Sequence, residues 1–206
     1  NIEQTAKQAR KVSKELLRYV DDGYAVIALT ASCGLMLKFE WPLILPDDAD
    51  IKRLAENTFD IDQYVVDIAR KEGLVDGLKP LDGGVTVHLP CHARAQNMGP
   101  KSADMLRLIP EPKVAVVERC SGHGGTFGVL KGTHEIAVKV GRPAARAAQR
   151  QGNAHLASSC PLAGAHLLQV MGAGADKTDD AAPARRPFHP IELMAQAYGI
   201  DFLDAE

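Results

Sequence analysis

Short apolar segments alternate with helical segments along this chain, and this alternation constrains its fold more than any other feature. Helical stretches of 10–15 residues between short apolar runs are typical of βαβ units, whose strands lie parallel. We therefore predict an α/β fold with parallel sheets flanked by helices. The expected strands are Y-A-V-I-A-L (24–29), V-T-V-H-L (85–89), K-V-A-V-V-E (113–118) and A-H-L-A-S (154–158).

Apolar residues at helical spacing predict the helices. A unit of helix, glycine, strand, cysteine turn and helix appears around Cys33 and again around Cys160, which predicts two related halves, the first incomplete. The segment G-L-M-L-K-F-E-W after Cys33 predicts a helix that breaks at Pro42. Residues 73–84 and 173–187 are expected to be loops. The other expected helices cover residues 3–21, 48–58, 60–71, 101–108, 135–151, 161–171 and 191–198.

Composition narrows the class of protein. The chain has 206 residues, a formal net charge of −2 and 46% hydrophobic residues. This balance excludes global disorder and argues against a nucleic-acid binder, which normally carries a basic excess. No apolar run reaches the roughly 18 residues of a membrane helix. Residues 1–22 read as a charged amphipathic helix rather than a secretory signal, so we expect a soluble, cytoplasmic protein.

Each of the four cysteines directly follows a predicted strand. Sites in open α/β sheets form beyond the carboxyl ends of strands, so this shared position favours a common site. The long spacings exclude a zinc finger or ribbon, whose ligands come in close pairs. Metal or cluster ligation, inert thiols and disulfides all stay open at this point. The cysteines are Cys33, Cys91, Cys120 and Cys160.

A glycine-rich loop follows Cys120. Glycines there let the backbone approach a cluster closely, and successive N–H groups can form a nest for negative charge. The loop therefore predicts a cofactor contact, although it lacks the spacing of a nucleotide-binding motif. The glycines concerned are Gly122, Gly124 and Gly125.

Several segments, taken in order, resemble the cysteine-rich CCG domain: H-L-P-C-H-A-R, C-S-G-H-G-G-T-F-G, S-S-C-P-L-A and H-P-I-E-L. This family includes a subunit of heterodisulfide reductase and the iron–sulfur subunits of anaerobic glycerol-3-phosphate dehydrogenase and glycolate oxidase. Upstream, T-A-S-C-G-L-M-L-K-F-E-W-P resembles the end of a preceding repeat. The resemblance implies the last part of a first CCG-like repeat with a helical insertion in residues 1–80, and a second CCG-like domain in residues 81–206. It also implies a missing N-terminal part of the same chain.

The family pattern is a Cys, a later Cys-Cys-Gly and a final Cys-x-x-Cys, whose thiolates bind an iron–sulfur cluster. Cys91, Cys120 and Cys160 match three of these positions, whereas Ser121 and Ala163 stand where the family has cysteine. We therefore do not expect a five-thiolate noncubane cluster. Three thiolates can hold a 4Fe–4S cluster if a fourth ligand comes from histidine, a serine such as Ser121, solvent or substrate. Three thiolates and a histidine can equally hold zinc.

The fourth ligand has several candidates. His123 lies three residues past Cys120 in the glycine-rich loop, whereas His92 would need an unusual turn to share a metal with the preceding cysteine. Cys33 occupies the second Cys-x-x-Cys position of the upstream repeat, where Thr30 replaces the first. We therefore count His123 and Cys33 as further metal candidates.

The resemblance implies an electron-transfer protein, or the cluster-binding subunit of a heterodisulfide reductase-like oxidoreductase. A flavoprotein or another redox protein would be its partner, and peripheral association with a membrane stays open. One alternative is a zinc-binding interaction module. Another is a degenerate domain whose remaining cysteines are structural.

Overall fold

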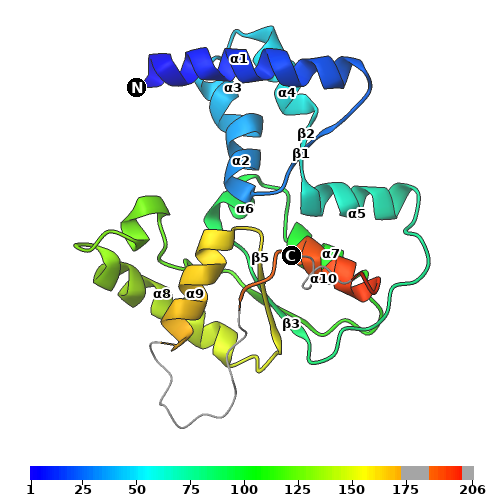
Figure 1. The fold of residues 1–206 in the computed structure, drawn as a ribbon, viewed down its shortest axis with the longest axis vertical. Coiled ribbons are helices and arrows are strands. Elements are labelled where there is room, and N and C mark those ends of the chain that lie inside the picture. Colours follow the sequence, from blue (N-terminus) through cyan, green and yellow to red (C-terminus); the bar gives the residue numbers. More distant parts are fainter. Residues whose placement is uncertain (173–185, 201–206) are drawn as a thin grey trace.

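The computed structural model describes residues 1–172 and 186–200, which form two parallel sheets flanked by helices (Figure 1). The smaller sheet pairs β1 (Val26–Ala28) with β2 (Thr58–Asp60). In the larger sheet, β3 (Val85–His88) lies between β4 (Val114–Val117) and β5 (His155–Ser158), and both pairs are parallel. The predicted α/β class with parallel sheets is confirmed.

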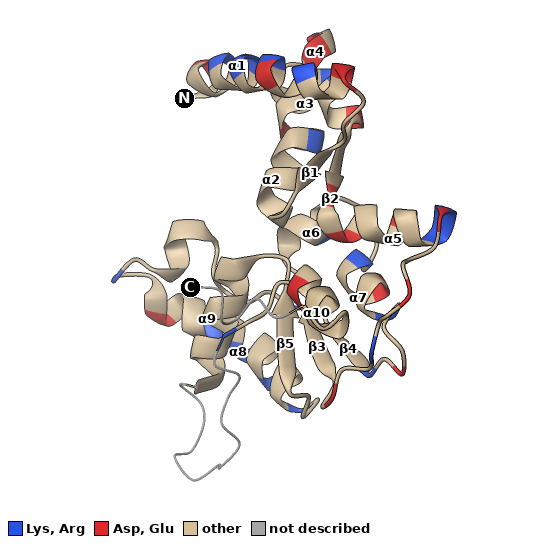
Figure 2. Ribbon diagram, turned by 45° about the vertical axis from the view of Figure 1, so that its right-hand side comes forward, with Lys and Arg blue, Asp and Glu red and all other residues tan. Residues whose placement is uncertain are grey.

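The first part of the chain builds the smaller sheet and a group of helices at the top of Figure 1. Its apolar core includes Leu17, Trp41 and Leu54. Residues of both charge signs lie along its first helix (Figure 2), as expected for a solvated face. The helices are α1 (Ile2–Asp21), α2 (Ala31–Leu35), the π-helical η1 (Met36–Glu40), α3 (Trp41–Ile44) and α4 (Ala49–Glu56).

The helix after the first cysteine turn runs through Pro42, so the predicted break there was wrong. α2, η1 and α3 follow one another without interruption. The widened turn of η1 lets the N–H of Trp41 donate to the carbonyl of Met36, five residues earlier. Pro42 follows directly after this widened turn, as the second residue of α3.

The larger sheet lies between two layers of helices (Figure 1). The helices of this part of the chain are α5 (Ile61–Lys71), α6 (Cys91–Ala95), α7 (Lys101–Leu106), the 3₁₀-helical η2 (Gly125–Gly128), α8 (His134–Gln149), α9 (Pro161–Gly172) and α10 (Pro190–Ala197). Val85 and Val87 of the central strand pack in a cluster with residues of α7 and α10. Val117 and Leu156 of the outer strands pack with residues of α8 and α9. Both faces of the sheet are therefore covered, as parallel sheets require.

β2 is an element that the sequence did not predict, because its residues were assigned to the ends of two helices. Three residues are too few to show a strand periodicity. Asp60 also caps the next helix, since its side chain accepts a hydrogen bond from the N–H of Asp62. That helix, α5, places Val66 in the core beside the larger sheet. The division into parts at residues 80 and 81 stays a prediction.

The loop predicted for residues 173–187 falls mostly on residues 173–185, which lie outside the described part of the chain. Within the described ranges, none of the helices is both long enough and apolar enough to cross a membrane.

Candidate metal centre

Three cysteines lie at the carboxyl edge of the larger sheet, because each follows one of its parallel strands. Cys91 is the first residue of α6, Cys120 follows β4, and Cys160 directly precedes α9. All three are free thiols; Cys91 and Cys120 are exposed and Cys160 is partly buried. This edge therefore presents soft ligands to the outside of the protein.

Cys33 belongs to the smaller sheet but lies against the same edge. It is an exposed thiol in α2, directly after β1. The N–H of Ala31 donates to the carbonyl of Ser159, 3.3 Å away, and Ser159 is the residue before Cys160. Figure 1 shows α6 between α2 and the larger sheet. The cysteine turns of both parts thus adjoin.

His88 joins the ends of the three strands of the larger sheet. Its Nε2 lies 2.9 Å from the carbonyl of Arg119, so Nε2 carries the proton and donates. Its Nδ1 lies 3.2 Å from Ser158 Oγ, which in turn accepts from the N–H of Cys160 at 3.4 Å. Burial lowers the pKa of His88, which keeps the ring neutral. A chain of hydrogen bonds therefore fixes the backbone next to two of the cysteines.

The loop after Cys120 depends on glycine for close packing. Gly122 has a φ of +85°, and a Cβ there would lie 2.1 Å from the carbonyl oxygen of Ala137 in α8. Its N–H donates to Cys120 Sγ at 3.3 Å. Gly124 and Gly125 also have positive φ, and a Cβ on Gly125 would meet no atom within 4 Å. Gly122 therefore joins the loop to α8 and also contacts the sulfur.

His123 points between α8 and α9. Its ring centroid lies 5.9 Å from that of His166, which lies 6.1 Å from that of His134. His123 is 8% exposed, and its buried Nε2 has no hydrogen-bond partner among the described residues. A buried nitrogen without a partner costs free energy, so it is available to a ligand. By contrast, His92 is exposed, and its Nδ1 lies 3.9 Å from Cys91 Sγ.

The sulfurs do not form a ready-made ligand group. Within residues 1–172 and 186–200, no three histidine, cysteine or acidic side chains are arranged to hold a metal ion. The donor set still fits an iron–sulfur cluster or a soft metal: thiols at one exposed edge, an N–H that faces a sulfur, and an unpartnered histidine nitrogen. Binding of a cluster or metal ion would therefore require the thiols to move closer together.

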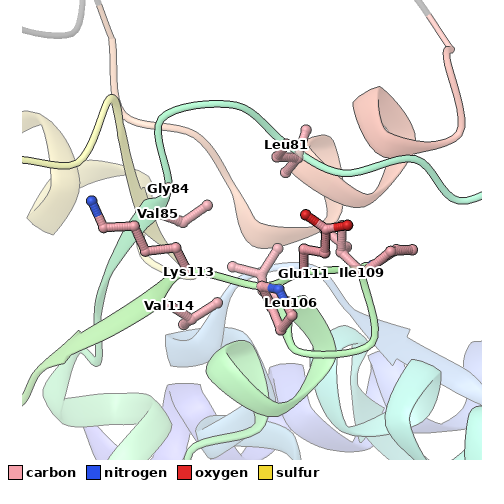
Figure 3. A pocket seen from close by; sticks show the side chains of 10 residues that line it. Leu81, Gly84, Val85, Leu106, Ile109, Glu111, Lys113 and Val114 are labelled. Atoms are coloured by element: carbon pink, nitrogen blue, oxygen red, sulfur yellow. The ribbon is translucent and has the colours of Figure 1, made fainter.

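The opposite edge of the larger sheet offers no comparable site. Figure 3 shows a small cavity there, at the beginnings of β3 and β4, with Val85 and Val114 in its wall. Its volume of about 10 Å³ is no more than one water molecule needs. A larger hollow of about 490 Å³ lies beside η2 and α8, next to His134. The walls of this hollow come from η2, α8, α9 and the segment between η2 and α8, and none of its lining residues is a cysteine.

Comparison with known proteins finds relatives that include the following three. The chain is 34% identical over 138 residues to lactate utilization protein A of Geobacillus kaustophilus, a match that covers 61% of this chain and 54% of the relative. It is 29% identical over 178 residues to a subunit of anaerobic glycerol-3-phosphate dehydrogenase of Escherichia coli, covering 85% and 41%. It is also 32% identical over 147 residues to an uncharacterized iron–sulfur protein of Methanococcus maripaludis, covering 69% and 26%. No family model matches the chain.

These relatives agree with the resemblance found in the sequence, since one is an iron–sulfur protein by name and another is a dehydrogenase subunit. The chain spans about half the length of the lactate utilization proteins it matches.

Proposed function

We propose that this chain is an electron-transfer subunit that binds a 4Fe–4S cluster through Cys91, Cys120 and Cys160. One observation carries the proposal: the three thiols follow three neighbouring parallel strands and lie at one exposed edge. Such a cluster accepts one electron and passes it on. The similarity to an iron–sulfur protein and to a dehydrogenase subunit supports the same function.

The chain's own groups orient and stabilise the thiolates. The N–H of Gly122 donates to Cys120 Sγ and offsets negative charge on the sulfur. The hydrogen bonds of His88 hold Arg119 and Ser158, so the segments that carry Cys120 and Cys160 keep a fixed separation. Such supporting contacts tune a metal site as much as its direct ligands do.

Two residues compete for the fourth ligand position in this proposal. The buried, unpartnered Nε2 of His123 supports a histidine ligand. The hydrogen bond from Ala31 to Ser159 supports Cys33, because it holds the Cys33 turn beside Cys160. The substitutions described below separate the two.

Electrons enter and leave through a partner protein, for which we propose a flavoprotein or another redox protein. Exposed apolar side chains next to the Cys120 loop offer a contact surface: Phe127, Val129 and Leu130. Exposed apolar groups that gather on one surface mark protein contacts. We also propose that the chain works in the cytoplasm, as a subunit of a heterodisulfide reductase-like oxidoreductase.

The test is anaerobic purification, or reconstitution with iron and sulfide, followed by iron and sulfide analysis and EPR of the dithionite-reduced protein. We expect about four irons per chain and a cluster signal that Cys91→Ser, Cys120→Ser and Cys160→Ser each diminish. His123→Gln and Cys33→Ser identify the fourth ligand, because only the true ligand changes the spectrum. His155→Gln, at the other end of β5, is the matched control and keeps the wild-type signal.

A cluster that survives the loss of all three cysteines would reject the proposal. Stoichiometric zinc without iron in freshly purified protein would instead support the zinc-binding interaction module. A chain without metal whose partner binding is unchanged by the triple substitution would support a structural role for the cysteines.

A further inference from the structure

Two buried carboxyl groups lie where the two parts of the chain meet. Asp60 is the last residue of β2, and Asp62 is in the first turn of α5. They are 1% and 0% exposed. Aspartate is almost never buried so completely unless it is paired with a cation. Neither carboxyl group takes part in any of the ion pairs formed by the described residues.

The hydrogen bonds of the pair come from neutral groups. Asp60 Oδ1 accepts from the N–H of Asp62 at 3.0 Å, and Asp60 Oδ2 accepts from Gln96 Nε2 at 3.4 Å. Asp62 Oδ2 accepts from Ser102 Oγ at 2.5 Å. Asp62 Oδ1 is buried and has no partner in the described part of the chain. One carboxyl oxygen is thus free to carry a proton.

Burial explains why the pair retains a proton near neutral pH. Burial raises the pKa of Asp62 to about 7, and the charge of Asp60 acts in the same direction. Burial also raises the pKa of Asp60, against the opposing effects of His189 and Lys38. The ammonium of Lys38 bonds to Gln63 Oε1 at 2.9 Å, so it does not neutralise the pair by direct contact.

Gln96 connects this pair to two cysteine-bearing segments. It is the C-cap of α6, the helix that begins with Cys91. Its amide donates to the carbonyl of Ala31 at 3.1 Å as well as to Asp60. A Cβ on Gly34, the residue after Cys33, would lie 3.0 Å from the same amide nitrogen. The carboxyl pair and the cysteine edge therefore share one buried side chain.

We propose that the Asp60–Asp62 pair is a proton-binding site coupled to reduction of a cluster at the cysteine edge. The proposal rests on the proposed function. One electron from a one-electron donor enters the cluster, the donor is oxidised, and one proton from water binds the carboxyl pair. The added negative charge favours uptake of the proton, because the carboxyl pair lies in a buried, low-dielectric region where it responds strongly to nearby charge.

The experiment is redox titration of the reconstituted full chain, with dithionite as donor and EPR as readout, between pH 5.5 and 8.5. The midpoint potential of the wild type should be nearly constant below about pH 7, where the pair already holds its proton. Above that pH it should fall with a slope that approaches 59 mV per pH unit, the one-electron equivalent of a tenfold change in proton concentration. Asp62→Asn should flatten this slope. The matched control is Asp67→Asn, which removes a carboxylate from a half-buried position of the same helix and should keep the wild-type slope.

A second readout does not depend on the cluster. In the cluster-free chain, infrared difference spectra between acid and alkaline pH should show the C=O stretch of a buried carboxylic acid, which titrates near pH 7 and is absent from Asp62→Asn. If Asp62→Asn does not fold, Asp60→Asn replaces it in this measurement. Loss of the Asp60 charge should shift the titration of Asp62 to lower pH. A loaded cluster with a pH-independent potential overturns the coupling alone. A chain that binds no cluster overturns the proposed function and the coupling together, even where the infrared band is present.

Discussion

Replacement of Asp62 by asparagine should stabilise the protein at alkaline pH and have little effect in acid. Folding raises the pKa of this carboxyl group from 3.8 to about 7. Between these values the folded chain keeps a proton that the unfolded chain has lost, so the free energy of unfolding falls as pH rises. This difference of about 3 pKa units between the folded and unfolded chain corresponds to about 4 kcal/mol of unfolding free energy, which is fully lost above pH 7. Asparagine has no charge to bury and can still accept from Ser102, so Asp62→Asn should recover up to about 4 kcal/mol at pH 8.5.

Urea unfolding at several pH values, with equal metal content in both proteins, measures this effect. The quantity of interest is the difference in unfolding free energy between variant and wild type, because titration of the histidines is common to both. Asp67→Asn, on the same helix, controls for the loss of one negative charge at a less buried position. A variant-minus-wild-type difference that stays constant from pH 4 to 8.5 would refute the reasoning.

Two further substitutions test the framework of the cysteine edge. His88→Ala should lower the unfolding free energy by about 2–4 kcal/mol, because it leaves a cavity and removes the partners of Arg119 and Ser158. Chemical denaturation measures this; the partly exposed His155→Ala, which removes one hydrogen bond and a ring contact, should cost only about 1 kcal/mol. Gly122→Ala should cost at least about 3 kcal/mol because the new Cβ would meet backbone 2.1 Å away, whereas Gly125→Ala should cost about 1 kcal/mol, since it has positive φ but open space. Equal losses for the two glycine variants would contradict the close-packing role of Gly122.

Features that depend on neighbouring residues were predicted well from the sequence. The strands around Val85, Val114 and His155 and most helices lie within a few residues of their expected positions. The common edge of three cysteines follows from this, because parallel strands end on the same side of a sheet.

Features that depend on distant contacts were not predicted. β2 is held by pairing with β1, and three residues carry no periodicity of their own. The partners of the buried carboxyl groups lie 36 and 40 residues away in sequence, at Gln96 and Ser102. The two aspartates of D-I-D, at the junction of a short strand and a helix, were the only local signal. The ligand roles of the cysteines and of His123 stay predictions, because the thiols of the described residues are not gathered into a group.

The order of strands in the larger sheet has a consequence for synthesis of the chain on the ribosome. The central strand emerges first, and its contact with β5 joins His88 to Ser158, 70 residues apart. Sheets with such distant pairings form slowly, since a long loop has to close before the contact is gained. The nascent chain therefore exposes Cys91 and Cys120 well before Cys160 is synthesised. Iron and sulfide delivered at that stage would find only two of the three proposed thiol ligands.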